Sequence, residues 1–163
     1  MRKFLPFCLL LPLLAKPVLS GKTQADQSGR IVARQAYSFP DYETAATITD
    51  VKLYASSNEY EAALKDERFE FAKVVYLSDG LRVICYEYRP KKTDGRKYPA
   101  IVFNRGSYVR GEIAPELIVL FRRLASAGYV ILAPLYRGSD GGEGRDEMGG
   151  ADLDDLLNVA PLV

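Results

Sequence analysis

Two short apolar runs, separated by an amphipathic stretch, constrain the fold of this chain more than any other feature. Residues 99–103 and residues 129–133 are continuously apolar, which is typical of strands covered on both faces. Between them, residues 115–127 place leucines and a phenylalanine at helical spacing, with Pro115 suited to the first helical position and Gly128 to the end. A strand, a helix and a strand in this order predict two parallel strands of one sheet.

A β-hairpin is expected before these strands. Residues 73–77 and 81–86 read as strands, and they flank Ser78-Asp79-Gly80, where Asp-Gly favours a tight turn because both positions tolerate positive φ. Farther on, a glycine-dense loop over residues 136–150 leads to a last helix near Ala151. The expected fold class is therefore α/β: an N-terminal β-hairpin at one sheet edge, plus two parallel strands with flanking helices.

A further short helix is expected after a candidate N-cap at Ser57, and it runs to about Asp66.

The last helix begins with several aspartates. Carboxylates are favourable near the positive N-terminal end of a helix, so these aspartates need no metal ion to explain them and no metal site is expected there. The aspartates of its first turn are Asp152, Asp154 and Asp155, and the residues expected to share its apolar face are Leu153, Leu156, Leu157 and Ala160.

The N-terminal sequence predicts export. Arg2 and Lys3 precede the apolar run of residues 4–15, and small residues precede a cleavage site near Ser20. A membrane anchor is the alternative, but the run is shorter than the roughly 20 apolar residues that a spanning helix needs. We therefore expect a periplasmic or secreted protein, with a signal peptide over residues 1–20, a flexible leader over 21–36 and a folded domain over 37–163.

Composition excludes several classes of site. The chain has no histidine, so no Ser-His-Asp or Cys-His site can be assembled from its own residues. Its 22 Lys and Arg against 21 Asp and Glu indicate no basic face, so neither nucleic acid nor an anionic membrane is an expected partner. The glycine-dense loop lacks the Lys-Ser/Thr pair of a phosphate-binding loop, and no cofactor is expected. Cys85 is interpreted as a small packed hydrophobe.

Five segments together carry a resemblance to a known family: Tyr76–Leu81, Tyr88–Pro90, Phe103–Gly106, Tyr136–Gly144 and Gly150–Asp155. They resemble the prolyl-oligopeptidase-like branch of the α/β-hydrolases, which includes dipeptidyl and acylaminoacyl peptidases. The resemblance runs from about Phe69 to Val163 and covers only the N-terminal half of that family's domain, so it implies an incomplete α/β-hydrolase fold.

The resemblance implies a serine hydrolase whose nucleophile, acid and histidine lie beyond Val163. No serine of this chain stands in a G-x-S-x-G elbow, so no catalytic residue is expected within it and the chain alone is expected to be inactive. In the family, the loop after the third strand supplies a backbone N–H to the oxyanion hole. That loop contains Asn104, Arg105, Gly106 and Ser107, and it departs from the more usual His-Gly-Gly type sequence. The alternative is a tight connection that needs glycine for backbone reasons.

The loop after the second apolar run has two interpretations. Tyr136 and Arg137 are candidates for lining a substrate pocket. Alternatively, Arg137, Glu143, Arg145 and Asp146 form ion pairs that order the loop.

Three functions remain open from the sequence. The first is the N-terminal part of an exported peptidase-like serine hydrolase, which acts on peptides or small esters through a serine ester. The second is a non-catalytic remnant or binding protein with half of the fold. The third is a fragment of an esterase or dienelactone-hydrolase-like enzyme. Without the nucleophile strand as its neighbour, the strand of residues 101–103 is expected to form an apolar, unpaired edge, and the chain is expected to self-associate through it.

Overall fold

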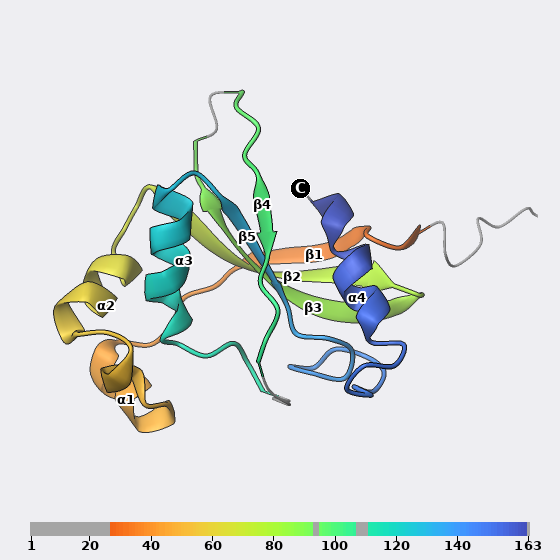
Figure 1. The fold of residues 1–163 in the computed structure, drawn as a ribbon, viewed down its shortest axis with the longest axis horizontal. Helices are drawn as coiled ribbons and strands as arrows, with labels where there is room; N and C mark the ends of the chain where they lie inside the picture. Colours follow the sequence, from red (N-terminus) through yellow and green to blue (C-terminus); the bar gives the residue numbers. More distant parts are fainter. Residues whose placement is uncertain (1–26, 93–94, 107–110, 163) are drawn as a thin grey trace, which may run out of the picture.

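The computed structural model describes residues 27–92, 95–106 and 111–162 of the chain (Figure 1). A five-stranded sheet in the order β1-β2-β3-β5-β4 forms its centre. The β4–β5 pair is parallel and every other pair is antiparallel. The strands are β1 (Ile31–Ala36), β2 (Phe69–Ser78), β3 (Leu81–Pro90), β4 (Ala100–Val102) and β5 (Val130–Pro134).

Helices cover both faces of the sheet (Figure 1). Phe121 of α3 packs with Tyr86 and Tyr88 of β3 in one core, which also contains residues of α1 and α2. On the other face, Val159, at the end of α4, packs with Cys85. The helices are α1 (Tyr42–Ile48), α2 (Ser57–Leu64), α3 (Leu117–Ser126) and α4 (Leu153–Asn158), with 3₁₀ turns η2 (Val51–Leu53) and η3 (Ala160–Leu162).

The expected hairpin and the parallel strand pair are confirmed. Phe69 of β2 pairs with Pro90 of β3, and the ladder continues to Ser78 and Leu81 at the turn. At that turn Asp79 and Gly80 have φ of 50° and 79°, the conformation that an Asp-Gly turn requires. The fold is therefore a mixed α/β arrangement, as the sequence predicts.

The leader expected over residues 21–36 is wrong for its last six residues, because Ile31–Ala36 form β1. All six side chains are exposed, so this strand has no hydrophobic alternation to signal it. Backbone pairing with β2 and the ion pairs of Arg34 with Glu70 (2.9 Å) and Glu87 (2.8 Å) hold it. As a result β1, and not the hairpin, forms that edge of the sheet.

The expected cover of β4 on both faces and the expected face of α4 are wrong. Ala100 and Val102 of β4 are exposed, because this strand is the other edge of the sheet, which is the edge position expected for residues 101–103. On α4, Leu157 is 71% exposed, whereas Asp155 is fully buried. The helix therefore turns the carboxylate of Asp155 toward the sheet, while Leu153 and Leu157 are exposed.

Two helix starts differ from the sequence-based expectation by one or two residues. Ser56, not Ser57, is the N-cap of α2, and it forms a reciprocal capping box with Glu59. The helix α3 begins at Leu117, so Pro115 lies in the preceding turn. No helix in the described part of the chain is long and apolar enough to cross a membrane.

Candidate functional site

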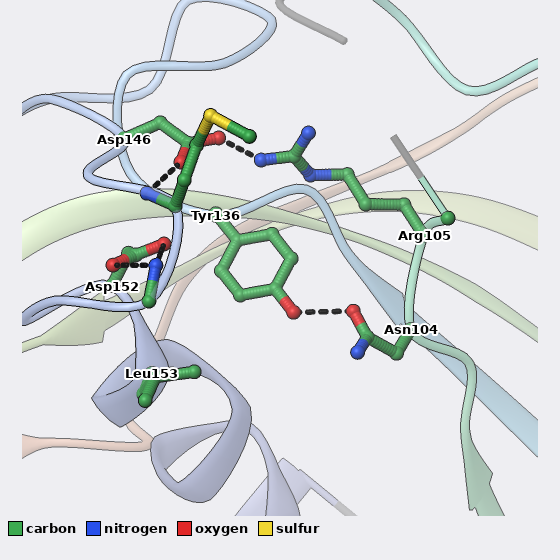
Figure 2. A pocket seen from close by; sticks show the side chains of 9 residues that line it. Asn104, Arg105, Tyr136, Asp146, Asp152 and Leu153 are labelled. Atoms are coloured by element: carbon green, nitrogen blue, oxygen red, sulfur yellow. Dashed lines mark hydrogen bonds and ion pairs between the residues drawn. The ribbon is translucent and has the colours of Figure 1, made fainter. Parts of the chain in front are cut away.

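The carboxyl ends of the two parallel strands adjoin a cavity of about 270 Å³ (Figure 2). In open α/β sheets, ligands bind beyond the carboxyl ends of parallel strands, because the connecting loops diverge there. One wall comes from the residues that follow β4, and the other comes from the long loop after β5 and the start of α4. The labelled lining residues are Asn104, Arg105, Tyr136, Asp146, Asp152 and Leu153.

Tyr136 links the two walls. Its hydroxyl donates a hydrogen bond to the amide oxygen of Asn104, and the Arg105 guanidinium lies 4.6 Å from the centre of its ring. Tyr136 has a φ of 65°, a left-handed conformation that costs a non-glycine residue about 1–2 kcal/mol. The contacts with Asn104 and Arg105 therefore hold a strained backbone that aims the ring between the walls.

Two carboxylates complete the wall opposite β4. Asp146 forms an ion pair with Arg105 and accepts a hydrogen bond from the Met148 amide at 2.9 Å. Asp152 is 2% exposed and accepts from the amides of Gly149 and Gly150, the latter at 2.7 Å. These contacts fix the loop, so the cavity has a defined polar rim.

Arg137 is directed away from this cavity, whereas its neighbour Tyr136 lines it. The Arg137 guanidinium contacts Asp155 and Asp79, each at 2.8 Å, and the hydroxyl of Ser78 donates to Asp155 at 2.5 Å. Hydrogen bonding to Asp155 raises the pKa of Arg137, so the guanidinium keeps its positive charge. Arg137 therefore connects the loop, the hairpin turn and α4, and it takes no part in the cavity wall.

Three of the four loop candidates after β4 line the cavity. Asn104 and Arg105 line the cavity, and Ser107 lies outside the described residues. Gly106 also lines it, and a Cβ added there would meet no atom of the described residues within 4 Å. Neither crowding nor a left-handed φ explains this glycine, in contrast to Gly138, where φ is 80° and an added Cβ would lie 2.9 Å from the Gly144 carbonyl oxygen.

Sequence reasoning missed the inward position of Asp152 and Asp155. From the sequence, the favourable interaction of a carboxylate with the N-terminal end of the last helix explains both aspartates. With Val159 they recur at positions i, i+3 and i+7, a spacing that places three residues on one helical face. That spacing is the signal that could have indicated a polar buried face.

Positioning and hydrogen bonding are the chemistry that these residues can supply. The sequence contains no histidine, and no serine has the nucleophile-elbow pattern. Cys85 is fully buried on the α4 side of the sheet, and burial raises the pKa of its thiol well above the usual range. A thiol in that state is a poor nucleophile, so Cys85 is a packing residue.

One curated protein shows similarity to this chain. The "Uncharacterized peptidase YtmA" of Bacillus subtilis (strain 168) is 35% identical over 91 residues, which is 55% of this chain. The chain spans about a third of that relative's length, since the match covers 34% of it. No family model and no solved structure matches the chain. The matched part of this chain is therefore similar to one part of a protein that is named as a peptidase.

Proposed function

We propose that this chain is the N-terminal part of an exported serine hydrolase of the prolyl-oligopeptidase-like type. The observation that carries the proposal is the 35% identity with a peptidase over 91 residues. The cavity at the carboxyl ends of β4 and β5 supports it, because the loop from Asn104 to Gly106 is where an α/β-hydrolase carries an oxyanion donor. Gly106, which no contact with the described residues explains, is the candidate donor.

In this proposal the chemistry is acyl transfer. A serine on a strand after Val163 attacks the carbonyl of a peptide or ester, and histidine carries the proton to the leaving group. The contribution of the present residues is a backbone N–H directed at the developing oxyanion. Because the chain supplies neither histidine nor a serine elbow, it is inactive alone.

The coding DNA that follows codon 163 tests the proposal first. We expect a G-x-S-x-G motif followed by aspartate and histidine, in frame or after a frameshift. Unrelated sequence there would overturn the proposal in favour of a non-catalytic remnant. Export is tested separately, by N-terminal sequencing of the secreted or periplasmic protein, which should begin at Gly21.

Kinetics of the protein encoded by the longer reading frame test the role of Gly106. Gly106→Pro removes the backbone N–H, so kcat should fall by about 100-fold while KM changes little. Gly111→Pro is the matched control in the same connection and should leave kcat within a factor of a few. Equal loss in both variants would contradict the assignment. Comparing peptide with ester substrates then separates a peptidase from an esterase.

A further inference from the structure

A second, more apolar cavity lies on the α3 side of the sheet. Its volume is about 370 Å³, within the range of small-molecule sites in proteins, roughly 300–1,000 Å³. Phe103, Leu117 and Leu135 contribute apolar walls. Arg105 and Gly106 line both this cavity and the one at the strand ends, so the two adjoin.

Two carboxylates line this apolar cavity, and each is held by a neutral donor. The hydroxyl of Tyr37 donates to Glu112 at 2.9 Å, and the hydroxyl of Thr49 donates to Glu116 at 2.8 Å. Burial and the hydrogen bond to Glu112 raise the pKa of Tyr37, which therefore stays a protonated, neutral donor. A hydroxyl group orients each carboxylate but brings no positive charge to it.

The positive charge in the cavity wall already has a carboxylate of its own. Arg105 forms an ion pair with Asp146, which belongs to the other cavity. Within the described residues, the ion pairs found include neither Glu112 nor Glu116. The described lining thus combines apolar walls with a net negative rim, and a cation with an apolar body complements both.

We propose that this cavity binds a ligand with an apolar body and a protonated amine, with the ammonium group between Glu112 and Glu116. In the hydrolase proposed above, it is the pocket that recognises an amine-bearing group of the substrate, and this role rests on that function. Binding of the ammonium ligand itself depends on the cavity alone. The two proposals can therefore fail separately.

Binding of three probes to the full chain tests the site. Phenethylammonium is the cation, 2-phenylethanol its neutral counterpart and 3-phenylpropionate an anion of similar shape. Titrations followed by amide chemical shifts should show saturable binding of the cation at Ile113, Leu117 and Leu135. Its affinity should exceed that of the alcohol by about fivefold, the effect of partly exposed ion pairs, and the anion should not saturate.

Charge-removing variants locate the effect. In the double variant Glu112→Gln/Glu116→Gln, the cation should bind no more tightly than the alcohol. The affinity for the alcohol should be the same as in the wild-type chain. Glu43→Gln with Asp154→Asn removes the same charge from exposed positions elsewhere and should leave the preference intact. The proposal is overturned if wild-type chain binds the cation and alcohol equally, if no probe binds, if the shifts lie elsewhere, or if the control pair removes the preference. The wild-type comparison stands even if the glutamine variant does not fold.

Discussion

At the scale of single residues, Asp155 shows how a polar core position is stabilised. Its carboxylate is fully buried and accepts hydrogen bonds from Ser78 and from the Arg137 backbone and guanidinium. The hydroxyl of Tyr76 donates to its backbone carbonyl oxygen at 2.8 Å. Removing one member of such a buried pair leaves the other charge without compensation, which costs more than the pair itself contributes.

Replacing Asp155 with alanine should therefore destabilise the fold severely. The expected loss is about 3–5 kcal/mol in the free energy of unfolding, because the Arg137 charge is left buried. Urea denaturation followed by tyrosine fluorescence measures it. Asp154→Ala, at the exposed neighbouring position, should change the free energy by no more than about 0.5 kcal/mol. Similar losses in the two variants would show that Asp155 is not an internal anchor.

Gly106 and Gly138 should respond differently to replacement by alanine. Gly106→Ala should leave stability within about 0.5 kcal/mol of wild type, because an added methyl group meets no atom of the described residues within 4 Å. Gly138→Ala should cost at least about 1–2 kcal/mol, since φ is 80° and the new Cβ would crowd the Gly144 carbonyl. Thermal melts of both variants check the contrast, and equal melting temperatures would contradict it.

At the scale of elements, Asp66 joins the end of α2 to α3. Its carboxylate accepts hydrogen bonds from Arg68 at 2.7 Å and from Arg122 of α3 at 2.6 Å. The hydrogen bond from Arg68, with the help of Arg122, holds the pKa of Asp66 well below its usual range. The two helices are thus connected by a carboxylate that must remain ionised.

Stability should depend on pH through Asp66. Its folded pKa is lowered, so its contribution is complete above the unfolded pKa of about 3.9 and is lost as pH falls toward the folded value. Asp66→Asn should lower the free energy of unfolding by about 1.5–3 kcal/mol at pH 7, and the gap to wild type should narrow below about pH 4. Denaturation at several pH values measures this gap.

The matched control is Asp50→Asn, at an exposed position whose side chain makes no capping hydrogen bond to η2. Its stability should follow the wild type at every pH within about 0.5 kcal/mol. A gap between wild type and Asp66→Asn that stays constant down to pH 2 would refute the role of the Asp66 charge.

At the scale of the whole molecule, the sheet has two edges of different character. The β1 edge carries Arg34, which pairs with glutamates of β2 and β3. The β4 edge consists of Ala100, Ile101 and Val102 and carries no charge. Leu153 and Leu157 of α4 are exposed as well, on the helix that begins beside the residues after β4. An apolar, unpaired edge is a template for pairing with another strand.

We therefore expect the chain to self-associate through β4. Val102→Lys should shift the protein toward monomer, because a charged side chain blocks edge-to-edge pairing. Val32→Lys is the matched change on the opposite edge and should not alter the association. Sedimentation velocity over a range of concentrations measures both. A wild-type chain that stays monomeric at high concentration would contradict the expectation.

Much of the fold could be predicted from sequence because its signals are local. The Asp79–Gly80 turn and the run of residues 130–134 each specify their own conformation. The strand β1 could not be predicted, because none of its side chains enters a core and its pairing partner lies more than 35 residues away. The sequence predicts Ser57 as the N-cap of α2, whereas the structure has Ser56. Either serine could cap the helix, and the reciprocal hydrogen bonds with Glu59 select Ser56.

The site shows the same division. The sequence alone determined the strand–helix–strand order, the glycine-dense loop and the absence of histidine, all of which depend on neighbouring residues or on composition. The tertiary structure alone decided that Tyr136 lines the cavity while Arg137 is directed away from it, and that Asp155 is buried and Leu157 exposed. Those outcomes depend on which distant side chains, here Asp79 and Ser78, come within hydrogen-bonding distance, and no local pattern contains that information.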